Sequence, residues 1–245
     1  MHTVMSPAED VAQLRVKIFA DGADLRGMIE YAANPLIKGF TTNPTLMRQA
    51  GITDYGIFAR EVLSHITDRP ISFEVFSDEF DEMYRQAQKL AAFGPNVVVK
   101  IPVTNTRGES AGPLIAELTL EGIPLNVTAV MTLEQVRSVC LNLAGGAPSI
   151  VSVFAGRVAD TGRDPVPTMR AALEHTNALD NVELLWASPR EVLNVIQADE
   201  IGCDIITATH DVLKKLNGLG KNLDQFSLET VKMFADDAAS AGFSL

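Results

Sequence analysis

The chain has 245 residues, 47% of them hydrophobic, which is enough to bury the core of one large domain or two small ones. Its formal net charge of −11 argues against nucleic acid or an anionic membrane as a partner, although a small anionic substrate can still meet basic residues in one cleft. No apolar run approaches the roughly 18 residues of a membrane span, and the acidic N-terminal stretch lacks the pattern of a signal peptide. Cys140 and Cys203 lie far apart among apolar residues, so we expect free buried thiols in a cytoplasmic protein, with a disulfide between them as the less favoured alternative.

Short apolar runs rich in β-branched residues recur at even intervals and predict strands, and the segments between them repeat apolar residues at spacings typical of helices. Thr132 and Ser188 precede two of these helical segments as expected cap residues. A last helix over 223–243 is expected to pack on the outside. The predicted strands are 16–21, 37–43, 71–76, 97–103, 124–130, 149–156, 182–188 and 203–209, and the clearest helices are 55–66, 79–93, 133–144 and 190–201.

Strand and helix alternating in this way along the whole chain predict an α/β fold, a (β/α)8 TIM barrel formed by residues 1–245 as a single domain. A doubly wound open sheet is the competing arrangement. It needs a topological switch point, usually with a glycine-rich phosphate loop after an early strand, and neither G-x-G-x-x-G nor a Walker sequence occurs. The barrel is therefore preferred.

Side chains alternate across a strand, so parity sorts each predicted strand into an inner and an outer set. In residues 97–103, Val97, Val99, Ile101 and Val103 share one smooth face that should meet the helices. Lys100 lies on the other face with Val98 and Pro102, and it therefore points into the barrel. The same rule turns polar and aromatic side chains of the other strands inward, towards the carboxyl ends where barrel enzymes keep their active sites. These residues are Asp21, Thr41, Asn43, Ser72, Glu74, Asn126, Thr128, Ser152 and Phe154.

Two arginines and a serine follow the late strands of the predicted barrel. Arg157 comes after the sixth strand, and Ser188 and Arg190 come after the seventh. Loops after late strands often bind phosphate in barrels, and a guanidinium fork suits that group. We therefore expect the anionic end of a substrate here.

Each of these residues also has a purely structural interpretation. Lys100 can be half of a buried ion pair with Glu74 or Asp21, and Asn126 and Thr128 can satisfy each other. Turns, caps and surface positions are the structural interpretations of Asp21, Asn43-Pro44, Ser188-Pro189, Arg157, Arg190 and the helix-entry pair His210-Asp211. The functional interpretation rests on all these residues together. If each had only a structural role, there would be no reason for them to share one strand parity and one end of the barrel.

A lysine in such a pocket suits Schiff-base chemistry, because a desolvated amine is a nucleophile that condenses with a carbonyl. The iminium then accepts electrons when a neighbouring carbon–carbon bond breaks, and Glu74, Thr128 and Asp21 can supply the acid–base groups. A close carboxylate favours the charged form of a lysine. We therefore expect Glu74 to act through a water or to be held back from direct pairing with Lys100.

The stretches FADGAD, GFTTNPTLM, VVVKIPVT, GIPLNVTAV, VSVFAGRVAD and WASPRE resemble those of the transaldolase family, in the right order along the barrel. The resemblance implies a class I, Schiff-base barrel enzyme without metal or organic cofactor. Such an enzyme moves a dihydroxyacetone unit from a ketose phosphate to an aldose phosphate. It acts on small sugar phosphates rather than on nucleic acid or membranes, and a homo-oligomer is compatible with the outer packing of the last helix.

The resemblance also implies a role for each motif residue. Lys100 would form the Schiff base, Asp21 would accept the proton in carbon–carbon cleavage, and Glu74 and Thr128 would hold the water of imine formation and hydrolysis. Substrate contacts would come from Asn43, Asn126 and Ser152 at the dihydroxyacetone part, from Phe154 in the wall, and from Arg157, Ser188 and Arg190 at the phosphate.

The sequence departs from the family pattern at three places. Its length is closer to the small subfamily that includes fructose-6-phosphate aldolases, which typically carry Gln and Tyr where this chain has Glu74 and Phe154. That pair favours transfer over free aldol cleavage. The serine-proline-arginine of 188–190 is unusual for the family, so another anionic tail, such as a sulfonate, stays open. A Schiff-base aldolase and a sugar-phosphate-binding barrel without turnover also stay open as functions.

Overall fold

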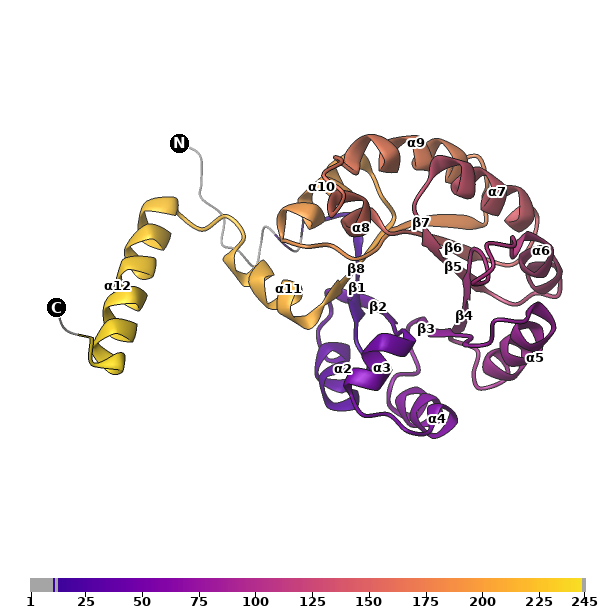
Figure 1. Ribbon diagram of the computed structural model, residues 1–245, viewed down its shortest axis with the longest axis horizontal. Helices are drawn as coiled ribbons and strands as arrows, with labels where there is room; N and C mark the ends of the chain where they lie inside the picture. Colours follow the sequence, from indigo (N-terminus) through magenta and orange to yellow (C-terminus); the bar gives the residue numbers. More distant parts are fainter. Residues whose placement is uncertain (1–10, 12, 244–245) are drawn as a thin grey trace.

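The protein is described by a computed structural model that covers residue 11 and residues 13–243. Eight parallel strands follow one another in sequence order and close into a barrel, with β8 paired to β1 (Figure 1). The predicted (β/α)8 barrel is confirmed. The strands are β1 Lys17–Asp21, β2 Ile37–Thr41, β3 Ile71–Glu74, β4 Val97–Pro102, β5 Leu125–Val130, β6 Ser149–Val153, β7 Val182–Trp186 and β8 Ile205–Thr209.

Helices surround the barrel, and several begin at a side-chain cap. Thr132 caps its helix through a capping box with Gln135, as its position in the sequence predicts. Ser188 does not begin a helix, because its backbone is left-handed and the next helix starts only at Leu193. The helices are α2 Leu25–Ala32, α3 Pro44–Gln49, α4 Tyr55–His65, α5 Phe80–Ala91, α6 Gly112–Leu120, α7 Leu133–Leu143, α8 Ala155–Ala159, α9 Val166–Thr176, α10 Leu193–Ile201, α11 His210–Lys215 and α12 Leu223–Ala241, with a 3₁₀ turn at Leu216–Gly218.

Apolar residues fill two separate layers. The larger core lies between strands and helices and contains the outward residues of every strand, such as Val99 and Ile101 of β4. A smaller cluster fills the barrel interior. It consists of Phe19, Val98, Ile150, Leu185, Ala187 and Ile205, with Phe154 packed against it.

The inner cluster forms a floor beneath the polar residues. Phe19 and Val98 each lie two residues before an inward polar residue, Asp21 and Lys100, and side chains two apart on a strand share a face. Gly39 makes room for this floor, because a Cβ at that position would lie 2.5 Å from Cζ of Phe19. Water is therefore excluded from below the polar layer, which desolvates its charges.

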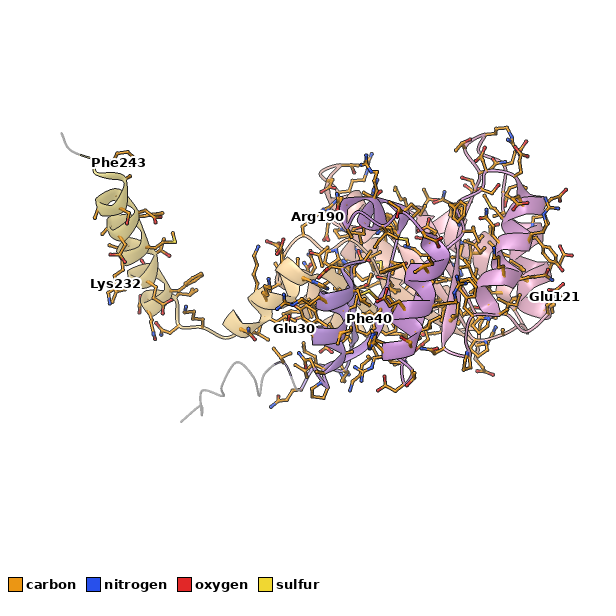
Figure 2. The ribbon with its side chains drawn as sticks, turned by 90° about the horizontal axis from the view of Figure 1, so that it is seen from below. Glu30, Phe40, Glu121, Arg190, Lys232 and Phe243 are labelled. Atoms are coloured by element: carbon orange, nitrogen blue, oxygen red, sulfur yellow. The ribbon has the colours of Figure 1, made fainter. Side chains whose placement is uncertain are left out.

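The last helix does not pack on the barrel as expected. None of the residues of α12 is buried, and the helix stands away from the barrel in Figures 1 and 2. Its large apolar side chains are exposed, with Phe226 at 53% and Phe234 at 63%. The sequence pattern predicts an amphipathic helix but does not say which surface covers its apolar face.

Candidate active site

A cavity of about 500 Å³ opens at the carboxyl ends of the strands. It is called the barrel pocket here. Its walls come from strands on both halves of the barrel and from the loops after β2, β6 and β7. All but two of the predicted site residues line it, namely Asp21, Asn43, Glu74, Lys100, Thr128, Ser152, Phe154, Arg157 and Ser188; Asn126 and Arg190 do not.

Lys100 of β4 is 5% exposed and points into the barrel pocket. Its Nζ donates a hydrogen bond of 3.0 Å to the carbonyl oxygen of Thr42 and lies 3.2 Å from Oε2 of Glu74. The expectation that Glu74 is held back from direct pairing is therefore wrong. Glu74 and Lys100 are register partners on β3 and β4, so the pleat carries both side chains inward side by side.

Asp21 ends β1 and faces the same pocket. The hydroxyl of Thr41 donates to Oδ1 of Asp21 over 2.7 Å, and the hydroxyls of Thr41 and Thr207 are 2.5 Å apart. Burial raises the pKa of the Asp21 carboxyl, against the opposing charge of Lys100 and the hydrogen bond from Thr41. A carboxyl with a raised pKa is a better proton acceptor once ionised.

Two threonines beside Asp21 line the pocket although the sequence analysis assigns them no role in the site. Thr207 is not among the residues predicted to point inward, and Thr41 is predicted to point inward but without a role. Both line the barrel pocket. The parity rule could have found Thr207, because Ile205 of the same strand belongs to the inner cluster and lies two residues earlier.

Asn126 lies beneath the barrel pocket and is fully buried. Its Nδ2 donates to Oγ of Ser72 over 3.0 Å, and Oγ of Ser152 donates to its Oδ1 over 2.6 Å. The structural interpretation in which Asn126 and Thr128 satisfy each other is therefore wrong. Asn126 of β5 instead links β3, across the barrel interior beyond β4, with the neighbouring β6, and through Ser152 it supports the pocket wall.

The hydroxyl of Thr128 is buried and has no hydrogen-bond partner within the described part of the chain. Buried polar groups are rarely left without a partner, and each exception needs an explanation. Since Thr128 lines the barrel pocket, its hydroxyl is available to a molecule inside it.

Asn43 caps a helix and also lines the barrel pocket. Its Oδ1 accepts a hydrogen bond of 2.9 Å from the backbone N–H of Leu46 and so caps α3, while the residue lines the pocket. The sequence alone suggests a turn at Asn43-Pro44, and the structure shows the start of α3 there. The cap uses only the amide oxygen.

The basic end of the pocket lies at the loops after β6 and β7. Arg157 of α8 lies with its guanidinium carbon 5.4 Å from the ring centroid of Phe154, in cation–π geometry. Arg190 instead faces Asp160, the C-cap of α8, donating from Nε to Oδ1 over 3.0 Å and from Nη2 to Oδ2. Arg157 thus lines the pocket, while Arg190 is paired outside its wall.

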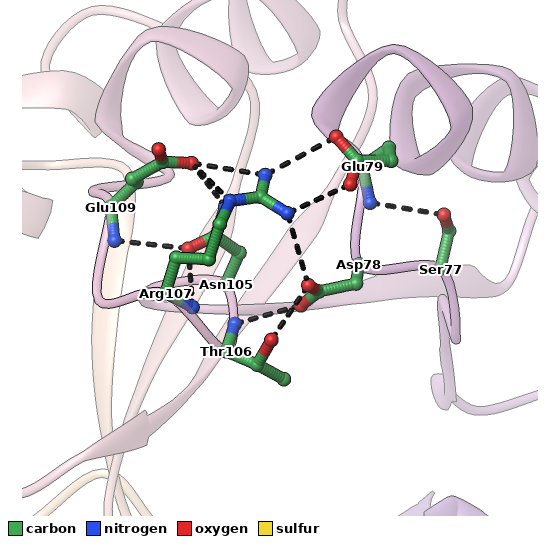
Figure 3. A network of polar contacts seen from close by, with 7 residues as sticks. All are labelled: Ser77, Asp78, Glu79, Asn105, Thr106, Arg107 and Glu109. Atoms are coloured by element: carbon green, nitrogen blue, oxygen red, sulfur yellow. Dashed lines mark hydrogen bonds and ion pairs between the residues drawn. The ribbon is translucent and has the colours of Figure 1, made fainter.

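A network of polar contacts joins the two loops that follow Glu74 and Lys100 (Figure 3). Arg107 donates to Glu79 over 2.8 Å and to Glu109 over 3.1 Å, while Thr106 donates to both carboxylate oxygens of Asp78. Glu79 is the N-cap of α5. The network therefore holds the rims beside β3 and β4 together, which limits the movement of the strands that carry the central ion pair.

Residue 11 and residues 13–243 contain no group of three or more His, Cys, Asp or Glu side chains that could hold a metal ion. Among the helices of the described residues, none is long and apolar enough to cross a membrane. Cys140 and Cys203 are free and buried, as expected.

The architecture and the polar pocket at the strand ends define a (β/α)8 barrel enzyme. The model of the transaldolase/fructose-6-phosphate aldolase family matches residues 18–245, and the chain belongs to that family. It is therefore an aldolase-type transferase at the family level.

Proteins that align with most of this chain are described in the same way. A "Probable transaldolase" of Methanococcus maripaludis strain C5 is 34% identical over 223 residues, which covers 88% of this chain and 99% of that protein. Another, from Hyphomonas neptunium, is 33% identical over 231 residues and covers 94% and 100%. A crystal structure of dihydrodipicolinate synthase from Rhodopseudomonas palustris aligns with a TM-score of 0.58 at 14% identity, over 96% of this chain and 81% of that one, which shows likeness of fold alone.

Proposed function

We propose that the protein is a class I transaldolase that transfers a dihydroxyacetone unit between sugar phosphates through a Schiff base on Lys100. The observation that carries this proposal is the buried amine of Lys100, which lies 3.2 Å from Glu74 in a pocket that also contains Asp21. Glu74 accepts the ammonium proton, and the neutral amine attacks the ketone carbon. Loss of water then gives the iminium, with Glu74 and the free hydroxyl of Thr128 holding that water.

Cleavage follows from the placement of Asp21 in the opposite wall. Its carboxylate removes the proton from the substrate hydroxyl, the carbon–carbon bond breaks, and the electron pair moves into the iminium to form an enamine. An aldehyde leaves. The enamine then attacks a second aldehyde, whose oxygen takes the proton back from Asp21, and hydrolysis of the new iminium frees the product.

The basic end of the pocket fits the phosphate of such a substrate. Arg157 and Ser188 line it, while Arg190 lies two residues further along the same loop. We assign the phosphate to Arg157 and Ser188, with Arg190 joining after it leaves Asp160. Phe154 carries no hydroxyl to protonate the enamine, which favours transfer over release of free dihydroxyacetone.

We also propose that the protein assembles as a homo-oligomer through α12. A helix of 19 residues with no buried side chain gains little stability of its own in water. A second copy offers the same apolar helix in return, which a symmetric exchange would bury.

The test of the Schiff base is incubation with fructose 6-phosphate and borohydride, followed by intact-mass and peptide mapping. A reduced dihydroxyacetone adduct on Lys100 is expected, and it should vanish in Lys100→Met but persist in the control Lys232→Arg, which alters an exposed lysine of α12. Absence of the adduct from the folded protein with every ketose phosphate tried would refute the proposal. Product analysis without an acceptor separates transfer from aldol release.

A further inference from the structure

His210 lies directly behind Asp21. It is the first residue of α11, which follows β8, and β8 pairs with β1 so that Thr209 is the register partner of Asp21. Its ring packs against the turn that follows Asp21. A Cβ on Gly22 would lie 3.1 Å from Nε2 of His210, and one on Gly27 would lie 2.6 Å from Cε1. The two glycines thus leave room for the imidazole.

The His210 ring is packed against an aromatic neighbour, and its Nε2 atom has no hydrogen-bond partner among the described residues. Tyr31 of α2 lies against it, with ring centroids 4.4 Å apart and tilted by 40°, and the Tyr31 hydroxyl donates to the carbonyl oxygen of His210 over 3.3 Å. The Nε2 atom is buried without a hydrogen-bond partner among the described residues. Helix entry, predicted from the sequence, explains the position of His210 but not why the Nε2 of a half-buried imidazole is left without a partner.

Asp21 separates two hollows. One is the barrel pocket, and the other, of about 380 Å³, is lined by both Asp21 and His210. The charged and titratable groups that face His210 are Asp21 of β1, Asp24 and Tyr31 of the β1–α2 unit, and Asp211 and Lys214 of α11. Burial lowers the pKa of His210 and raises the pKa of Asp21, so their titrations approach each other.

We propose that His210 is a positioning residue for Asp21, which holds the turn behind this carboxyl and controls its charge during carbon–carbon cleavage. The inference rests on the proposed function of the pocket. His210 should therefore affect carbon–carbon cleavage, the step in which Asp21 acts. Imine formation on Lys100, which uses Glu74 and Thr128, should not depend on it.

The variant His210→Phe keeps an aromatic ring against Tyr31 and removes both nitrogens. Borohydride trapping of free dihydroxyacetone on Lys100, which needs no bond cleavage, should stay within about twofold of wild type, while cleavage of fructose 6-phosphate should slow about tenfold or more. The control Tyr31→Phe keeps the stacked ring and should change neither rate. Equal loss of trapping and cleavage in a folded His210→Phe protein, or no loss of either, would overturn the proposal.

A titration tests the link between the two residues without relying on turnover. The carboxyl of Asp21 can be followed by ¹³C NMR of aspartate-labelled protein and assigned with Asp21→Asn. Since the charge of His210 lowers the pKa of Asp21, His210→Phe should move that titration to higher pH, and an unmoved titration would refute the inference. If the proposed function fails, the wild type will form no borohydride adduct on Lys100. The Asp21 titration would then still decide whether His210 influences this carboxyl.

Discussion

Gly156 of α8 lies directly against the carbonyl of Ser188, so that a Cβ on this glycine would stand 1.6 Å from the Ser188 oxygen. The N–H of Gly156 donates to the carbonyl oxygen of Ala187 over 3.3 Å, and Ser188 itself has a left-handed backbone with φ of 58°. An L-residue in this region is strained unless its surroundings hold it there. The close approach of α8 to the loop after β7 therefore fixes the basic end of the barrel pocket.

Gly156→Ala tests this contact. The added methyl group must displace the Ser188 peptide, so the free energy of unfolding should fall by about 1–3 kcal/mol. If Ser188 binds the substrate phosphate, KM for fructose 6-phosphate should rise about tenfold while trapping of free dihydroxyacetone is retained. Chemical denaturation and steady-state kinetics give the two values. Gly218→Ala is the matched control, since nothing lies within 4 Å of a Cβ there; equal behaviour of the two variants would contradict the prediction.

Thr128→Val should raise the stability of the fold and at the same time lower the catalytic rate. The Thr128 hydroxyl is buried without a partner among the described residues, so its replacement by a methyl group of similar size should raise the free energy of unfolding by about 1 kcal/mol. Imine formation and hydrolysis should slow, because the hydroxyl no longer holds the water. Thr42→Val is the comparison, since the Thr42 hydroxyl donates to the carbonyl oxygen of Ser72 over 2.9 Å. That variant should lose stability, and a stability loss in both would show that the Thr128 hydroxyl is already satisfied.

Asp21→Asn should change how stability depends on pH. Burial raises the Asp21 pKa above its ordinary value of 3.8, so the folded state binds this proton more tightly than the unfolded state. Stability therefore decreases as the pH rises from 3.8 through the folded pKa and is constant above it. The variant removes this cost. We expect it to be more stable than wild type at pH 7, with the difference shrinking towards pH 4 in urea unfolding series; a difference that grows on acidification would mean the folded pKa is lowered.

The sequence predicts the barrel and the inward face of its strands because both follow from local periodicity. Parity alone places Asp21, Glu74 and Lys100 in one pocket. It does not give distances between strands, so the direct contact of Glu74 with Lys100 depends on strand register, which no single strand encodes.

Loops and long side chains are less predictable than strands. The helix expected after Ser188 begins at Leu193, since the left-handed backbone at Ser188 is set by its contact with Gly156, which lies far away in the chain. The guanidinium of Arg190 turns to Asp160, and spacing in the sequence could not decide between that carboxylate and a ligand. Pocket residues carried on loops are thus set by tertiary contacts.

The apolar face of α12 predicts an assembly that one substitution should break. At 100° per residue, Leu223, Phe226, Met233 and Phe234 fall on one side of this helix, and Phe226 is 53% exposed. Figure 2 shows the side chains of α12 extending from a helix that stands clear of the barrel. A second copy that covers this face should be lost in Phe226→Glu, because a carboxylate buried in an apolar interface has no partner.

Leu228→Glu provides the matched control. Leu228 is also 53% exposed, but two residues along a helix it points about 200° away from Phe226, outside the apolar face. We expect light scattering coupled to size exclusion to find wild type and Leu228→Glu as oligomers and Phe226→Glu as a smaller species, with the adduct on Lys100 still forming because the barrel pocket is built within one chain. A monomeric wild type at micromolar concentration would contradict the assembly, and dissociation of both variants would show that the whole circumference of α12, rather than one face, is covered.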